Sequence, residues 1–178
     1  MKDAPNGYTI CRAEAWHLPF LNAVELAAAT IFPPEFLPPH VLLDRVPMPV
    51  LEKAQEESLL WVAVEEGKEP VGYALMQICG DSALLAQMDV HPGHGRKGLG
   101  RALVERAIEE AGRKDTANLY LTTFANIRWN APFYAKCGFV EVPENEHPGF
   151  IESILREERN HGLDNRIAMR YNGNEMPE

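Results

Sequence analysis

Cysteine is scarce in this sequence, with three residues in 178 and no Cys-x-x-Cys pair. An odd number of widely separated cysteines does not build a disulfide framework, and it favours a reducing compartment. A long apolar run is missing as well. The most apolar stretch, residues 23–32, contains Glu25 and stops at Pro33, and the first residues lack the apolar core of a secretory signal. These absences predict a cytoplasmic protein with no membrane partner.

Positive charge is also in short supply. Seventeen Lys and Arg residues stand against 26 Asp and Glu residues, which gives a formal net charge of −9. Because a negatively charged protein repels the phosphate backbone of nucleic acids, we expect no nucleic-acid partner. Its negative electrostatic potential favours a cationic substrate instead. With 46% hydrophobic residues and no low-complexity tract, the chain is expected to fold as a single domain over residues 1–178.

The hydrophobic pattern predicts a mixed α/β sheet with helices on both faces. Strands are expected over residues 8–12, 59–65, 71–78, 84–90, 117–124, 139–142 and 166–171, and helices over 18–31, 99–111, 130–136 and 148–160. Residues 33–49 hold six prolines, so we expect a loop there, placed over the active face. The charged residues 156–159 are expected on an exposed helix face.

A glycine-rich turn, VHPGHGRKGLG over residues 90–100, joins a predicted strand to a predicted helix. Backbone N–H groups at a helix N-terminus favour an anion such as a pyrophosphate, and glycine lets the phosphate approach closely. Arg96, Lys97 and Arg101 add positive charge beside the turn. An ordinary tight turn is the plain alternative.

The spacing Gly93-x-Gly95-x-x-Gly98 also matches the dinucleotide fingerprint, which makes a Rossmann oxidoreductase a second alternative. The surrounding sequence weakens it. An antiparallel hairpin is predicted before the turn, and no acidic residue ends the next strand to hold a ribose.

Two segments together resemble the GNAT superfamily of N-acetyltransferases. The first, MDVHPGHGRKGLGRALVERA, resembles the family's coenzyme A loop, Gln/Arg-x-x-Gly-x-Gly/Ala: Gly98 and Gly100 match its two small positions, whereas Gly95 stands where the family has Gln or Arg. The second, WNAPFYAKCGF, resembles the family segment ending in Tyr-x-x-x-Gly-Phe, in a form seen in poorly characterised bacterial members. With the first strand and helix and the last strand, the resemblance covers nearly the whole chain.

The resemblance implies the GNAT fold, a mixed and mostly antiparallel sheet with a central splayed parallel pair and helices on both faces. It implies direct transfer of acetyl from acetyl-CoA to a primary amine in a ternary complex, and it makes a homodimer our expectation. Tyr134 is then the general acid, since a phenol with a pKa of about 10 is protonated at neutral pH and can protonate the leaving thiolate. The expected cofactor-binding residues are Met88, Val90, Gly95, Arg96, Lys97, Gly98, Leu99, Gly100, Arg101 and Asn130.

Several points stay open in the sequence. The base that deprotonates the amine could be Asp89, Glu25, Glu35 or a relay through water. His91 and His94 lack a third ligand, so we expect no metal. No cysteine matches an acyl carrier, so no acyl-enzyme is expected. A module that binds acyl-CoA as a sensor without turnover is the rival from another class.

The acceptor amine is not encoded in any motif. If Glu25, Glu35 and Asp44 line the mouth of the site, small cationic amines and peptide amines rank above neutral or acidic ones.

Overall fold

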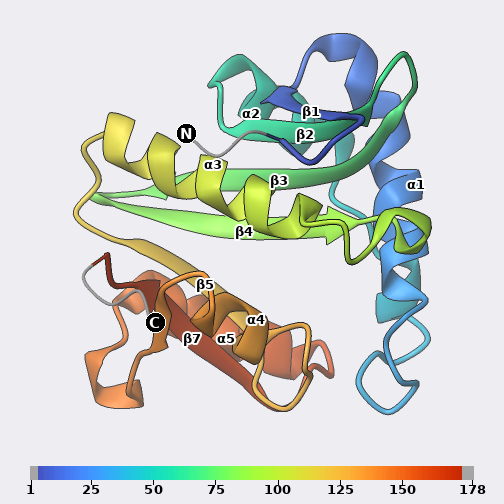
Figure 1. Cartoon of the computed structure of the whole chain (residues 1–178). Helices are drawn as coiled ribbons and strands as arrows, with labels where there is room; N and C mark the ends of the chain where they lie inside the picture. The colour runs from blue at the N-terminus through green and yellow to red at the C-terminus, as the bar shows by residue number, and fades with distance from the viewer. Residues whose placement is uncertain (1–3, 174–178) are drawn as a thin grey trace.

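The computed structural model describes residues 4–173 and arranges their strands in one open sheet in the order β1-β2-β3-β4-β5-β7-β6 (Figure 1). The strands are β1 (Tyr8–Arg12), β2 (Leu60–Glu65), β3 (Pro70–Cys79), β4 (Ser82–Val90), β5 (Leu119–Phe124), β6 (Phe139–Glu141) and β7 (Arg166–Tyr171). The helices are α1 (Leu18–Ala29), α2 (Met48–Glu56), α3 (Leu99–Arg113), α4 (Ala131–Ala135) and α5 (Gly149–Asn160). Short 3₁₀ turns cover Ala15–His17, Val41–Leu43, Pro92–His94 and Glu144–Glu146.

The parallel contact in the sheet is short. Within residues 4–173, every strand pair is antiparallel except β4–β5, and that pair is registered only at Ala83↔Leu119 and Leu84↔Tyr120. Beyond these two rungs the strands separate, so no described strand is hydrogen-bonded to the later part of β4 on its β5 side. The predicted splayed pair is confirmed, and the antiparallel pairings exclude the doubly wound sheet that the Rossmann alternative needs.

Helices cover both faces of the sheet, as predicted. On β3, the backbone of Gly72 lies against Leu103 of α3, whereas the next residue, Tyr73, points to the opposite face, where Glu25 of α1 lies. On β5, Leu121 joins the core that contains α3, and Tyr120 packs in a smaller cluster with α5. This period of two along the strands separates the two layers.

One prediction for residues 33–49 is wrong at its end. Most of the segment is irregular, with a 3₁₀ turn at Val41–Leu43, but α2 begins at Met48. Pro49 occupies the first turn of this helix, where a missing backbone N–H costs no hydrogen bond, so the proline that suggested a loop instead starts a helix. Leu51 and Ala54 then bury its inner face.

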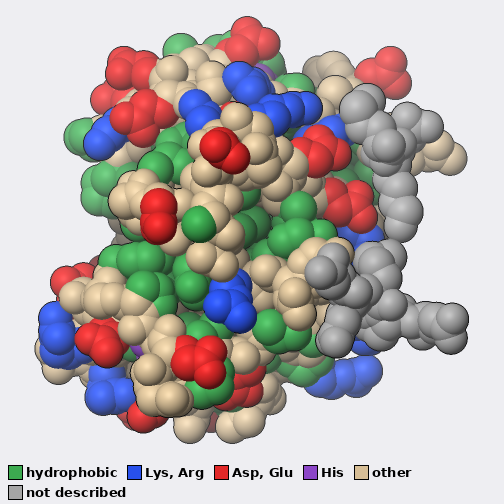
Figure 2. All heavy atoms as spheres, turned by 90° about the vertical axis from the view of Figure 1, so that its left-hand side faces the viewer, with side chains coloured by type: hydrophobic (Ala, Val, Ile, Leu, Met, Phe, Trp, Pro, Cys, Tyr) green, Lys and Arg blue, Asp and Glu red, His purple; other side chains and the backbone are tan. Residues whose placement is uncertain are grey.

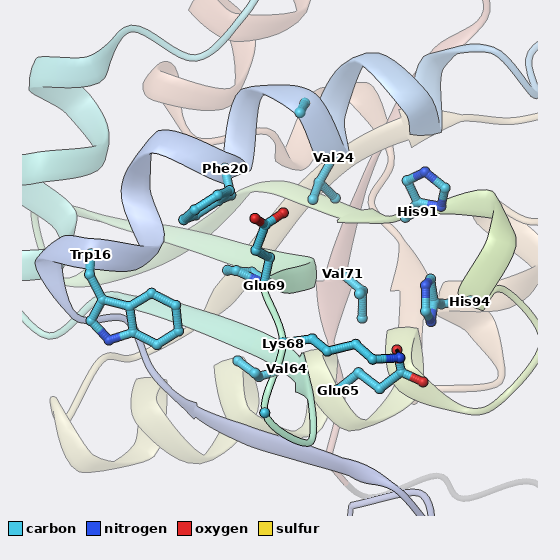
Figure 3. A pocket seen from close by; sticks show the side chains of 13 residues that line it. Trp16, Phe20, Val24, Val64, Glu65, Lys68, Glu69, Val71, His91 and His94 are labelled. Atoms are coloured by element: carbon cyan, nitrogen blue, oxygen red, sulfur yellow. Dashed lines mark hydrogen bonds and ion pairs between the residues drawn. The ribbon is translucent and has the colours of Figure 1, made fainter.

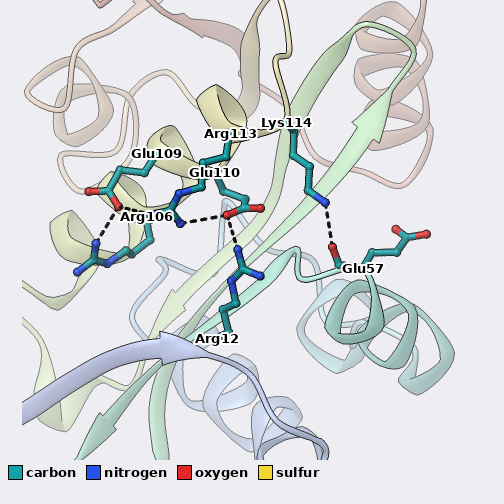
Figure 4. A network of polar contacts seen from close by, with 7 residues as sticks. All are labelled: Arg12, Glu57, Arg106, Glu109, Glu110, Arg113 and Lys114. Carbon is teal, nitrogen blue, oxygen red and sulfur yellow. Dashed lines mark hydrogen bonds and ion pairs between the residues drawn. The ribbon is translucent and has the colours of Figure 1, made fainter.

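The outer side of α3 is tied to the first strand by an ionic network (Figure 4). Glu110, which is 2% exposed, accepts hydrogen bonds from Arg12 of β1 at 3.0 Å and from Arg113 at 3.4 Å.

On the face seen in Figure 2, acidic and basic side chains are interspersed. No helix among residues 4–173 is long and apolar enough to cross a bilayer.

Candidate active site

The separation of β4 from β5 opens a cavity of about 330 Å³. Its walls come from the second half of β4, the end of β5, helices α1, α4 and α5, and the proline-rich segment after α1. Among the residues lining it are the polar and charged side chains of Glu25, Asp44, Arg45, Gln87, Asp89, Thr122, Thr123, Asn130, Tyr134, Glu158, His161 and Arg166. The polar groups therefore gather where the sheet is interrupted, and apolar residues such as Phe32 and Phe124 fill the rest of the wall.

Tyr134 reaches the cavity from α4 and is 9% exposed. Its ring packs edge-on against Phe133 and Phe139, with centroids 5.1 and 5.9 Å away. Burial, and then the nearby charge of Asp89, raise the pKa of Tyr134 above its ordinary value, because both disfavour the phenolate. The phenol is thus protonated at neutral pH and can donate a proton into the cavity.

Two carboxyl groups form an acidic wall of the cavity. Burial raises the pKa of Asp89 to about 7, and the nearby Glu25 adds to the rise, although the amide of Gln87 donates to Asp89 Oδ2 at 2.7 Å and opposes it. Burial also raises the pKa of Glu25, whose Oε2 accepts the backbone N–H of Val46 at 3.0 Å. Tyr73 of β3 lies near both: its hydroxyl is buried, has no hydrogen-bond partner in the part of the chain that the structure describes, and has a pKa that burial raises.

The far wall holds a paired cation. Arg166 donates to Glu158 at 2.8 and 3.1 Å, Thr122 donates to Glu158 at 2.7 Å, and the guanidinium lies 4.7 Å from the ring centre of Phe124. Glu158 belongs to the 156–159 run that we expected to face solvent, and this expectation is wrong for it. No local pattern distinguishes Glu158 from its neighbours, because only the packing of α5 on β5 and β7 turns that one side chain inward.

Arg45 was not singled out from the sequence either. It lies in the irregular segment before α2 and lines the cavity beside Glu25. Asp44 next to it accepts a hydrogen bond from His161 at 2.6 Å, with both side chains more than half exposed, so this contact marks the rim of the cavity. Glu35, in contrast, is exposed and is not part of the lining.

The glycine turn follows β4 directly and leads into α3. Gly98 has a φ of +88°, the left-handed conformation that favours glycine, and it caps α3 without a side-chain hydrogen bond. Among residues 4–173, no side chain at the N-cap bonds to the first N–H groups of this 15-residue helix. A Cβ added at Gly100 would lie 3.4 Å from the ring of Phe133, so the turn is also closely packed against α4.

Two of the three cations of the turn are held by neighbours. Lys97 donates to the hydroxyl of Tyr8 in β1 at 2.7 Å, and Arg101 donates to the backbone carbonyl of Lys136 at 3.1 Å. The Tyr8 hydroxyl is also 2.8 Å from Nδ1 of His94. Arg96 is exposed. The first strand thus supports the turn through contacts that no local sequence motif indicates.

The remaining predicted cofactor residues divide into three groups. Met88 and Asn130 line the cavity with Tyr134, and Asn130 accepts a hydrogen bond from Thr123 at 2.9 Å. Val90 and the exposed Gly95 lie at the exit of β4. Leu99 is buried in the core at 1% exposure, so only its backbone can face a ligand. The structure therefore places one set at the turn and another in the cavity.

A larger hollow, of about 1000 Å³, lies away from Tyr134 and Asp89, between α1 and the turn that joins β2 to β3 (Figure 3). It is lined mostly by apolar side chains, including Trp16, Phe20 and Val71, and His94 stands at one side of it. Within residues 4–173 no three His, Cys, Asp or Glu side chains are grouped so as to hold a metal ion.

Comparison with known proteins identifies the family. The family model described as acetyltransferase (GNAT) domain matches residues 56–141, which include the glycine turn and Tyr134. Residues 56–141 of this chain form a GNAT acetyltransferase domain. The prediction made from the two motifs is confirmed.

Relatives of this GNAT protein agree with that assignment. The [ribosomal protein bS18]-alanine N-acetyltransferase of Escherichia coli K12 is 31% identical over 96 residues, which are 53% of this chain and 65% of that protein. The crystal structure of the E. coli ribosomal-protein-S18-alanine N-acetyltransferase superposes with a TM-score of 0.64 and 26% identity, covering 92% of both chains. The matched segment thus spans less than two thirds of the length of the curated relative, and the superposition extends the likeness to most of the fold.

A more distant structure shares the fold. The N-acetylglutamate synthase of Neisseria gonorrhoeae, solved with coenzyme A and N-acetyl-glutamate, superposes with a TM-score of 0.69 at 19% identity, covering 92% of this chain and 34% of that one.

Proposed function

We propose that this protein is an acetyl-CoA-dependent N-acetyltransferase that transfers the acetyl group directly to a primary amine. The observation that carries the proposal is the two-rung β4–β5 contact. It leaves a cavity with the protonated phenol of Tyr134 on its wall. The start of α3, which no side chain of residues 4–173 caps, follows β4, the strand that forms one side of this cavity. A phosphate-bearing thioester and a proton donor can therefore meet at one opening.

The residues fit acetyl-CoA at two points. The start of α3 and the glycines before it offer backbone N–H groups to a pyrophosphate, and Arg96, Lys97 and Arg101 add positive charge. The unpaired edge of β4 near Met88 and Val90 offers backbone groups to the amide-containing pantetheine arm, with Asn130 on the opposite side. Leu99 contributes through its backbone because its side chain is buried.

Tyr134 supplies the proton for the leaving sulfur. Its raised pKa keeps it protonated until a strongly basic thiolate develops, and its packing between Phe133 and Phe139 holds the ring in place.

The test is release of free thiol from acetyl-CoA across a panel of amines, with Tyr134→Phe as the variant. General acid catalysis typically contributes about 10²–10⁴ in rate, so kcat should fall by about that factor while acetyl-CoA affinity, measured by calorimetry, stays nearly unchanged. Tyr120→Phe is the matched control, because Tyr120 is also buried but packs against Phe150 outside the cavity. Unchanged kcat in a chemistry-limited enzyme would reassign the acid, and binding without thiol release on any amine would favour the sensor.

Direct transfer also predicts that the enzyme itself is not acetylated. Mass spectrometry after incubation with acetyl-CoA alone should show no stable acetyl adduct. A stoichiometric adduct, for example on Cys137, would replace the ternary complex by an acyl-enzyme.

For the acceptor, we propose a cationic small amine or a peptide amine. Glu25, Asp44 and Asp89 supply negative charge to the cavity, which supports the ranking, while Glu35 no longer contributes to it. Because exposed charges are screened beyond about 8 Å at physiological ionic strength, the KM for such an amine should rise with salt. A preference for an acidic amine would refute the ranking.

The cytoplasmic location, the homodimer and the single domain over residues 1–178 stay predictions.

A further inference from the structure

We infer that Asp89, with Glu25 and Tyr73 around it, forms the subsite that binds the acceptor's ammonium group and removes its proton. The inference rests on the proposed acetyl transfer and names the group on which its first step depends. An alkylammonium has a pKa near 10.4, so the acceptor arrives charged and must lose a proton before its nitrogen can attack.

The position of Asp89 is the first support. Asp89 lies on the second half of β4, past the last β4–β5 rung, and lines the same cavity as Tyr134. The Asp89 carboxyl is near enough to raise the pKa of the Tyr134 phenol, so both groups border the space that the acceptor would occupy. Gln87 holds Oδ2 of Asp89 at 2.7 Å, so the carboxyl is oriented before any ligand binds. Glu35, the other carboxyl considered in the sequence, lies outside this lining.

The second support is the grouping of acidic hydrogen-bonding groups behind Asp89. Glu25 projects from α1 with one oxygen fixed by the Val46 N–H at 3.0 Å. Tyr73 of β3 lies near both carboxyls, and its fully buried hydroxyl has no hydrogen-bond partner within residues 4–173. Two partly buried carboxyl groups near each other repel when both are ionised, and a cation bound beside both offsets that cost. A protonated amine is therefore the ligand that this grouping recognises.

The other charged groups around the cavity do not compete with Asp89 and Glu25 for binding the ammonium group. Arg45, from the segment before α2, acts on both carboxyls and lowers the pKa of each, but does not overcome burial. Arg166 of β7 is already paired with Glu158 of α5, and Asp44 is paired with His161 at the rim. Asp89 and Glu25 are thus the cavity carboxyls without an ion-pair partner within 4.0 Å among residues 4–173.

The proposed step balances as follows. The Asp89 carboxylate takes one proton from R–NH₃⁺ and becomes a carboxylic acid, which leaves R–NH₂ with a free electron pair. That pair forms the C–N bond to the thioester carbonyl carbon, the C–S bond breaks, and the sulfur takes the proton of Tyr134. The second proton of the nitrogen returns to the Tyr134 phenolate, and Asp89 later releases its proton to solvent.

The pH profile of kcat/KM tests the assignment, on any amine that the wild type acetylates. Because Asp89 must be ionised to act, wild-type kcat/KM should rise with pH through about 7. Asp89→Asn should lower it by about 10²–10⁴ at neutral pH and remove this limb. Glu25→Gln should move the limb to lower pH, because a like charge near Asp89 is lost. Asp81→Asn, in the exposed turn before β4, is the control and should leave the profile unchanged.

A second measurement separates proton removal from a structural effect. A fluorinated analogue of the accepted amine, with a pKa below the assay pH, arrives neutral, so the loss in Asp89→Asn should shrink at least tenfold with that acceptor. Acetyl-CoA binding by calorimetry should be equal in wild type and variant. An unchanged limb, or an equal loss on both acceptors, would overturn the role of Asp89 while acetyl transfer by the wild type stood. A wild type that releases no thiol with any amine would instead overturn the proposed function and this assignment with it.

Discussion

Burial of the Asp89 carboxyl should make the stability of the protein depend on pH in a way that Asp89→Asn removes. The pKa of Asp89 rises from the ordinary 3.8 to about 7, chiefly because the carboxylate loses hydration. A group whose pKa is higher in the folded state contributes stability that is fully present below its unfolded pKa and lost as the pH rises through its folded pKa. The asparagine side chain does not ionise, so the free energy of unfolding of the variant does not fall with pH at this site.

The size follows from the two pKa values. Between pH 5 and pH 8 the wild type should lose about 2.5 kcal/mol of unfolding free energy through Asp89, at 1.36 kcal/mol per pH unit below the folded pKa. Relaxation of the ionised site makes this an upper limit. Relative to the wild type, Asp89→Asn should therefore gain up to about that amount at pH 8 compared with pH 5, or up to about 5–10 °C in Tm for a chain of this size.

Urea unfolding followed by circular dichroism at pH 5, 6, 7 and 8 measures the effect, with linear extrapolation to water. Asp81→Asn is again the control, because Asp81 is an exposed aspartate outside the cavity. Glu25 is present in both proteins and titrates in the same direction, so it cancels to first order. A constant difference between Asp89→Asn and wild type from pH 5 to 8 would refute the burial argument.

Two further substitutions test the turn and the ionic network. Gly98→Ala should weaken acetyl-CoA binding, because a φ of +88° costs a residue with a Cβ about 1–2 kcal/mol. Gly112→Ala is the control and should leave the affinity unchanged, since Gly112 is a helical position with free space around an added Cβ. Equal affinity in both variants would show that the turn is not part of the binding site. Glu110→Gln should lower the urea midpoint by the equivalent of about 1–2 kcal/mol, because the buried carboxylate loses its charge toward Arg12 and Arg113. A midpoint that also falls by this amount in 1 M salt would show that charge is not the cause.

The sequence was sufficient to predict the features of this protein that depend on local chemistry. Alternating and three- to four-residue periods located the strands and helices because each element must turn its apolar side to one core. The glycine turn and the Tyr134 segment were also readable, since a left-handed residue such as Gly98 and a short helix entry have requirements that few residue types meet.

The exceptions are contacts between segments far apart in the chain. Helix α2 was missed because a proline in its first turn has the same sequence signature as a proline in a loop. The place of β7 between β5 and β6 depends on strand pairing, which a periodic pattern does not specify. For the support of the turn by Tyr8 the partner residues are 86 and 89 positions apart.

The sequence by itself determined the kind of protein, namely a mixed sheet of the GNAT superfamily with a glycine-rich turn and a tyrosine in its second motif. Only the tertiary structure decided which acids share the cavity. Asp89, Glu25 and Glu158 are brought there from β4, α1 and α5, and Glu35 is left outside. The physical reason is that a pKa such as that of Asp89 is set by burial and by neighbouring charge, and both arise only when distant segments pack together.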